Sequence, residues 1–240
     1  MRVQDATVSV VLATYNEREH IVPLIDSLRA QIHQPLEIIV VDDNSRDGTA
    51  ESVERLGYAN VILIKRKVRG LASAFHRGIL ESKGDIVCWM DADLTMPVEV
   101  LVKMIARLNE YHIAIGSRYA EGGSDNRHII RVSASRFINW LAGTILGGGI
   151  KDYDSGFVAL RREVFNSVTL IPIGYGEYFI EMVYDAYRSG LKIVEVGYAF
   201  RDRSAGLSKS MPSLWAFFKT GMRYIIRIFS LRIRSRRGGN

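Results

Sequence analysis

The feature that most constrains the fold is the regular alternation of short apolar, β-branched runs with longer segments of helical periodicity. The strand-like runs cover residues 8–13, 37–41, 61–64, 86–90 and 113–115, and the helical segments cover residues 18–31, 48–56, 71–82 and 97–110. Strands that are apolar along their whole length and alternate with helices are typical of a parallel sheet covered on both faces. The first half of the chain therefore predicts an α/β fold.

The second half continues with weaker periodicity. A glycine-rich stretch at residues 121–126 is expected to form a mobile loop, followed by a helix at 132–146, a strand at 154–160, a helix at 177–188 and a strand at 192–199. No Pro- or Ser-rich linker divides the two halves. We therefore predict that the second half extends the same sheet, within one catalytic domain over residues 1–210.

Residues 211–240 are predicted to form a basic amphipathic tail. One stripe of its helix holds Leu214, Phe218, Met222, Ile225, Ile226 and Phe229. Residues 204–240 contain eight Lys and Arg and no Asp or Glu, whereas residues 1–203 carry 24 basic and 26 acidic groups. Such a helix suits an anionic membrane surface, and docking on the catalytic domain or on an integral-membrane partner subunit is the alternative. The acidic remainder argues against nucleic-acid binding.

Two further observations bear on location. The longest uncharged run, residues 137–150, is too short to span a bilayer, and no convincing signal peptide precedes residue 14. The single cysteine, Cys88, allows no internal disulfide. We therefore expect a peripheral protein on the cytoplasmic face of a membrane.

The clearest chemical signal is a pair of aspartates that ends the apolar run at residues 86–90. Asp91 and Asp93 lie one residue apart, so in an extended chain they point the same way and repel each other unless a cation lies between them. Hard oxygen ligands suit Mg²⁺ or Mn²⁺, whose coordination shells diphosphate oxygens and water usually complete. Acidic residues at strand ends also form turns and helix caps, which is the structural alternative.

Polar clusters follow the other early strands as well, namely Thr14-Tyr15-Asn16-Glu17, Asp42-Asp43-Asn44-Ser45 and Ser117-Arg118. In open parallel sheets ligands bind beyond the carboxyl ends of the strands, so these clusters should meet in one crevice. Neither G-x-G-x-x-G nor G-x-x-x-x-G-K-[ST] occurs, which argues against a Rossmann dehydrogenase and a P-loop enzyme. A nucleotide diphosphate bridged by a metal ion fits the pattern.

Five collinear motifs extend this interpretation. They read VVLATYNE at residues 10–17, VDDNSRDGT at 41–49, DADL at 91–94, GSRY at 116–119 and FRDRSAGLSK at 200–209. In this order the chain resembles the dolichol-phosphate mannose synthases, which are inverting glycosyltransferases of family 2 with a GT-A, Rossmann-like fold. The resemblance implies transfer of a sugar from a nucleotide sugar to a polyprenyl phosphate, with Mg²⁺ or Mn²⁺ as cofactor.

The resemblance also implies roles for individual residues. The nucleoside pocket would hold Ala13, Tyr15, Glu17, Val41 and Asp43, and the diphosphate and metal would lie at Asp91, Ala92 and Asp93. The acceptor phosphate would be held by Arg118, Arg203 and Lys209. Independently of the resemblance, Arg131 is a further candidate because it lies near the glycine loop at residues 122–123. Three positions depart from the family pattern: Ala13 replaces a usual Pro, Thr95 a Gln that helps to bind the metal, and Val158 an Arg. The Thr95 hydroxyl remains a candidate metal ligand.

Mannose from GDP-mannose is the favoured donor, and glucose from UDP-glucose is the alternative. A phosphatase of the haloacid-dehalogenase type would also match D-x-D-x-T at residues 91–95, but three strand–helix units precede that motif here, where the phosphatase fold begins with it. A membrane-tethered module that binds nucleotides without turnover is the non-enzymatic alternative.

Overall fold

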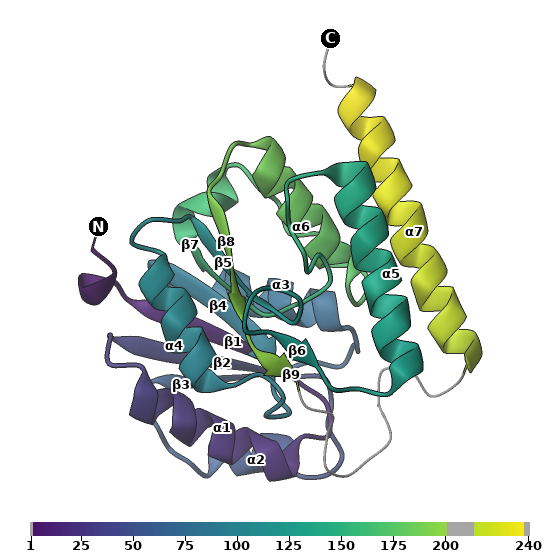
Figure 1. The fold of residues 1–240 in the computed structure, drawn as a ribbon. Helices are drawn as coiled ribbons and strands as arrows, with labels where there is room; N and C mark the ends of the chain where they lie inside the picture. The colour runs from purple at the N-terminus through teal and green to yellow at the C-terminus, as the bar shows by residue number, and fades with distance from the viewer. Residues whose placement is uncertain (1, 201–213, 238–240) are drawn as a thin grey trace.

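The centre of the molecule is a seven-stranded sheet. The structure is a computed structural model that describes residues 2–200 and 214–237, and in the last helix it describes the side chains of residues 218–235. The strands, labelled in Figure 1, are ordered across the sheet as β3 (Val61–Lys65), β2 (Leu36–Asp42), β1 (Val8–Thr14), β4 (Ile86–Asp91), β7 (Val158–Arg161), β5 (Ile113–Ser117) and β8 (Ile193–Gly197). Neighbours pair in parallel except where β7 takes part. The predicted mostly parallel α/β sheet is thus confirmed.

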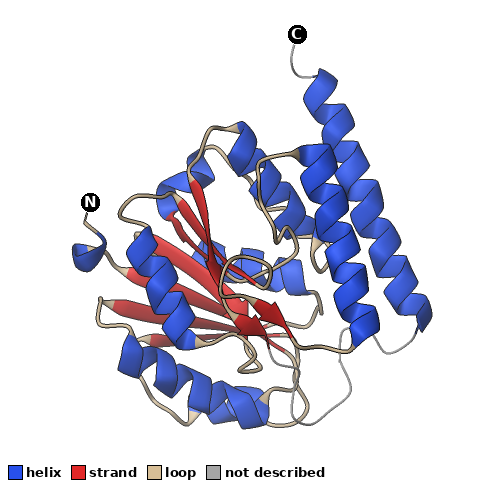
Figure 2. Ribbon diagram, in the orientation of Figure 1, coloured by secondary structure: helices blue, strands red, loops and turns tan. Residues whose placement is uncertain are grey.

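Helices cover both faces of this sheet, as Figure 2 shows. One face is covered by α1 (Arg18–Gln31), α2 (Thr49–Glu54) and α4 (Val98–Arg107), and the other by α3 (Leu71–Glu81), α5 (Ile129–Leu146), α6 (Glu177–Arg188) and α7 (Leu214–Arg237). Each face of the sheet has its own hydrophobic core. Along β1 the side chains of Val10 and Leu12 lie in the core beneath α1, α2 and α4, and that of Val11 lies in the core on the other face. Strands buried on both faces explain the unbroken apolar runs of the sequence.

Two sequence predictions need correction in the second half. The strand predicted at 154–160 begins only at Val158. It runs antiparallel between β4 and β5, a direction that could not be predicted because the hydrophobic pattern of a strand does not depend on its direction. Residues 154–157 instead precede it as irregular chain. The glycine-rich stretch predicted as a mobile loop contains the short strand β6 (Ser124–Asp125), which pairs with β9 (Ala199–Phe200) in a second small sheet.

The last helix, α7, packs along α5, as Figure 1 shows, and also contacts α6. Its Ile228 and Leu231 are wholly buried in the same core cluster as the sheet. The predicted boundary between residues 210 and 211 lies outside the described residues, yet the helix beyond it shares one hydrophobic core with the sheet. In the described part of the chain, no helix combines the length and the apolar character needed to cross a membrane.

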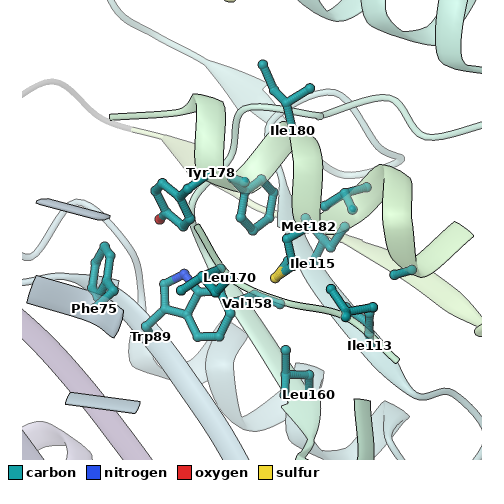
Figure 3. Close-up of a cluster of buried hydrophobic side chains, with 14 of the residues drawn as sticks. Phe75, Trp89, Ile113, Ile115, Val158, Leu160, Leu170, Tyr178, Ile180 and Met182 are labelled. Atoms are coloured by element: carbon teal, nitrogen blue, oxygen red, sulfur yellow. The ribbon is translucent and has the colours of Figure 1, made fainter. Parts of the chain in front are cut away.

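Aromatic packing beside β4 holds the carboxyl end of that strand in place. Trp89 of β4 lies 6.3 Å from Phe75 of α3, and Phe75 lies 6.1 Å from Tyr178 of α6, measured between ring centroids. Figure 3 shows these three rings together in the core. Asp91 follows Trp89 by two residues, so the packing of α3 and α6 positions the strand end that carries the aspartate pair.

Candidate active site

The loops at the carboxyl ends of β1, β2 and β4 contain unusual backbone conformations. Among the described residues other than glycine, only Asn16, Asn44 and Leu94 have a positive φ, between 57° and 64°. Asparagine tolerates this left-handed region, whereas it is unfavourable for a residue as bulky as leucine. Such strain concentrates where a backbone is held for function, and all three residues lie at the edge predicted to bind the ligand.

Hydrogen bonds lock the first two loops together. The Asp42 carboxylate accepts bonds from the Thr14 hydroxyl (3.0 Å) and the Ser45 amide (2.9 Å), and the Ser45 hydroxyl accepts one from the Asn16 amide (2.8 Å). The next residue, Asp43, turns the other way and accepts from the Arg66 guanidinium (2.7 Å) and the Gly70 amide (2.7 Å). Asp42 is therefore structural, while Asp43 faces a cavity and anchors the loop before α3.

A cavity of about 130 Å³ opens between these loops. Its walls come from the ends of β1, β2 and β4 and from the chain before α3 and α6, and they comprise Ala13, Thr14, Tyr15, Glu17, Asp43, Arg69, Gly70, Leu71, Asp91, Ala92 and Tyr175. The Arg69 guanidinium stacks 3.6 Å above the centroid of the Tyr15 ring. An aromatic ring, a cation and carboxylates in one cleft can hold the base, phosphates and ribose of a nucleotide.

The structure brings most of the predicted nucleotide-binding residues into this cavity. Ala13, Tyr15, Glu17, Asp43, Asp91 and Ala92 all line it. Two of the predicted residues do not line it: the Val41 side chain is wholly buried in the core, and Asp93 lies in the bend that follows β4. The motif at residues 41–49 places Val41 correctly at the end of β2. Successive side chains of a strand point to opposite faces of the sheet, however, and the Val41 side chain points into the core.

Asp93 lies in the turn that follows β4, where Thr95 holds it. Its Oδ1 accepts bonds from the Thr95 amide (3.1 Å) and the Thr95 hydroxyl (2.6 Å). Thr95 is itself buried, so its hydroxyl fixes the orientation of the Asp93 carboxylate. Asp91 lines the cavity of about 130 Å³ described above and also a neighbouring cavity of about 150 Å³.

Arg118 is buried in an ion pair rather than open to a ligand. Its Nε donates to Asp152 Oδ2 (2.9 Å) and its Nη2 to Asp152 Oδ1 (2.6 Å), and it also pairs with Asp154. Burial alone would lower the pKa of Arg118, but the two carboxylates outweigh that effect and hold the pKa above its usual value. Arg118 was predicted to contact the acceptor phosphate, whereas in this structure its guanidinium is buried and pairs with Asp152 and Asp154.

The other residues predicted for the acceptor phosphate are placed differently. Arg131 lies half-buried in the first turn of α5. Arg203 and Lys209 lie outside the described residues. Sequence reasoning missed Arg69, Asp154 and Tyr175, although the basic run at residues 65–69, directly before a helix, was a usable signal for the first of them.

The chain belongs to glycosyl transferase family 2, whose model matches residues 9–169. Within that class it is similar to the dolichol-phosphate mannosyltransferase of Pyrococcus furiosus, with 40% identity over 219 residues, covering 84% of this chain and 58% of that protein. The polyprenol monophosphomannose synthase of Mycolicibacterium smegmatis is 32% identical over 215 residues, covering 85% of this chain and 81% of that protein. The chain thus spans little more than half the length of the archaeal relative.

Solved structures agree on the fold. Glucosyl-3-phosphoglycerate synthase from Mycobacterium tuberculosis, crystallised with Mn²⁺, UDP and glucosyl-3-phosphoglycerate, superimposes with a TM-score of 0.72 at 23% identity, covering 94% of this chain and 80% of that one. The predicted GT-A fold is confirmed.

Proposed function

We propose that this chain transfers a mannose residue from GDP-mannose to the phosphate of a polyprenyl phosphate, with inversion at the anomeric carbon. The observation that carries the proposal is the position of Asp91, which lines both the nucleotide cavity and the adjoining cavity. A nucleotide sugar bound across that point would have its diphosphate at Asp91, with the nucleoside on one side and the sugar on the other. The similarity to a dolichol-phosphate mannosyltransferase supports the choice of sugar and acceptor.

The donor set at the aspartate pair fits a divalent cation shared with the substrate. Across residues 2–200 and 214–237 no cluster of three or more His, Cys, Asp or Glu could hold a metal ion by itself. Mg²⁺ is commonly held by one or two carboxylates together with substrate phosphates and water, which is what Asp91 and Asp93 offer. When bound, such an ion would stabilise the negative charge on the departing diphosphate. Thr95 would act by orienting Asp93.

The acceptor needs no general base from the protein. A phosphate monoester has its second pKa near 6, so at neutral pH it is already mostly a dianion. The task of the protein is to bring this anion close to a second anion, the nucleotide sugar, and cationic side chains offset their repulsion. Arg69 would serve the nucleotide, and we propose that Arg131, Arg203 and Lys209 serve the acceptor. Arg118 would position Asp152 and Asp154.

The partner surface that we propose is the cytoplasmic face of a membrane. Large apolar side chains stand exposed on both α5 and α7, which lie side by side in Figure 1: Ile129, Ile130, Phe137, Trp140, Phe218, Met222, Ile226, Phe229 and Ile233. The exposed basic residues Lys219, Arg223 and Arg232 also lie on α7. Aromatic and basic side chains together suit the interface of an anionic bilayer, where the lipid acceptor resides. An integral-membrane subunit is the alternative occupant of this surface.

The activity can be tested with a panel of labelled nucleotide sugars. The protein is incubated with polyprenyl phosphate, Mn²⁺ or Mg²⁺, and GDP-mannose, UDP-glucose or GDP-glucose, and the label that enters the organic phase is counted. We expect mannose from GDP-mannose only, and no transfer after chelation of the metal with EDTA. If only glucose is transferred, the proposed sugar is wrong and glucose takes its place. Nucleotide binding with no transfer of any sugar would overturn the enzymatic proposal.

A further inference from the structure

The cavity beside the nucleotide site has one wall made by the C-terminal helix. Thr220 and Tyr224 of α7 line it together with Asp91, Asp154, Tyr175 and Tyr178. The Tyr224 ring packs directly against the chain that leads into α6, since a methyl group at Gly176 would lie 2.5 Å from the Tyr224 hydroxyl oxygen. This close approach fixes the phenol at the cavity wall. The helix that sequence analysis treated as a tail therefore contributes side chains next to Asp91.

The chemistry of this cavity suits a neutral, hydroxyl-rich group. Apart from tyrosines, its ionisable lining residues are Asp91 and Asp154, and none of the described residues that line it is a Lys, Arg or His that could hold a second phosphate. Carboxylates, hydroxyls and tyrosine rings instead accept and donate hydrogen bonds to sugar hydroxyls and cover the apolar face of a sugar ring. Burial also raises the pKa of Tyr224, so its hydroxyl stays protonated and can donate a hydrogen bond.

From this geometry we infer that Thr220 and Tyr224 of α7 form a wall of the sugar subsite and help to select the hexose of the nucleotide sugar. The inference rests on the proposed transferase function, because it assigns the second cavity to the sugar that Asp91 joins to the nucleotide. It makes α7 part of the donor site. One face of the helix then contacts the sugar and the core, while Phe218, Met222 and Ile226 remain exposed on another face.

The test compares binding of a nucleotide with and without its sugar. Calorimetric titrations of GDP and GDP-mannose are made in Mn²⁺ without a lipid acceptor, on the whole chain and on the variants Tyr224→Phe and Thr220→Val. Each variant removes one hydroxyl and nearly preserves the shape of the side chain. We expect the Kd of GDP-mannose to rise by roughly fivefold, as for loss of one hydrogen bond, and that of GDP to change by less than about twofold.

Tyr111→Phe is the matched control. Tyr111 precedes the amino end of β5, whereas the site lies at the carboxyl ends of the parallel strands, so this substitution should change neither Kd. Thermal unfolding checks that each variant is folded. Equal shifts for GDP and GDP-mannose, or no shift for either variant, would overturn the inference. Failure of the wild-type chain to transfer sugar to polyprenyl phosphate would instead defeat the proposed function, and the binding comparison would still be interpretable.

Discussion

At the scale of single residues, the proposed cation site depends on the side chains at the end of β4. Asp93 is fixed by Thr95 through two hydrogen bonds to one carboxylate oxygen, and asparagine in its place keeps an oxygen that can accept them. The loop should therefore survive the change while the charge is lost.

We expect Asp93→Asn to reduce metal-dependent transfer on the order of a hundredfold or more, because it removes a charged ligand of the proposed metal ion, which would stabilise the departing diphosphate. Initial rates of lipid-linked mannose formation over a range of Mn²⁺ concentrations measure the effect. Asp26→Asn, on the exposed surface of α1, is the control and should retain full activity. Normal turnover by folded Asp93→Asn would eliminate the metal site.

The ion pair of Arg118 makes a stability prediction at the same scale. Asp152→Asn leaves a buried guanidinium with less compensating charge, and breaking such a pair costs about 3 kcal/mol of unfolding free energy. Urea unfolding of the variant measures the loss. Glu54→Gln removes the exposed pair between Glu54 and Lys65 and should change the unfolding free energy much less, because solvent screens that pair. Equal costs for the two variants would contradict the structural role of Arg118.

Asp125 gives the molecule an acid-sensitive contact. Burial alone would raise the pKa of Asp125, but hydrogen bonds from Arg127 and Tyr119 outweigh it and lower the pKa to about 2. Since an unfolded aspartate titrates near 3.9, the ionised form stabilises the fold above about pH 4, and this contribution is lost as the pH falls toward 2. The contribution is about 1 kcal/mol after allowance for solvent screening. The difference in unfolding free energy between wild type and Asp125→Asn should accordingly shrink from pH 5 to pH 2. A difference that stays constant over this range would refute the stabilising role of the ionised Asp125 carboxylate.

At the scale of elements, α7 is attached to α6 by charge as well as by apolar packing. The Glu181 carboxylate is buried and pairs with Arg227 (2.9 Å) and Arg234 (2.5 Å), and Arg234 also pairs with Asp185. We expect Glu181→Gln to speed amide hydrogen exchange in α7 by about tenfold, because the helix loses two ion pairs to the core. Hydrogen-exchange mass spectrometry of peptides from residues 214–237 measures this. Glu81→Gln, which breaks an exposed pair with Arg77 on α3, is the control. Unchanged exchange would mean that apolar packing alone holds α7.

The elements also show where prediction from sequence reaches its limit. Helices and strands of the first half were predicted within a few residues, because each carries its own periodic pattern of burial. The antiparallel direction of β7 and the pairing of β6 with β9 depend on contacts with partners far along the chain, which a local pattern does not encode.

At the scale of the whole molecule, the exposed apolar side chains of α5 and α7 make the proposed membrane contact testable. Binding to anionic vesicles should weaken as salt rises, because basic side chains contribute through screened attraction. Phe229→Ser removes a half-exposed ring and should lower vesicle partitioning by about tenfold in a sedimentation assay. Leu80→Ser, on α3, alters an even more exposed residue and should leave partitioning unchanged. Equal effects of both substitutions would argue against a defined membrane face.

The sequence by itself determined the class of fold, the clusters at the strand ends and the aspartate pair, since strand periodicity and the identity of a ligand are local properties. Only the tertiary structure decided that Arg118 is neutralised by Asp152 and Asp154, that Val41 belongs to the core, and that α7 returns to line the cavity beside Asp91. Charge compensation and burial depend on distances between residues remote in the chain, and only packing of the folded chain sets those distances.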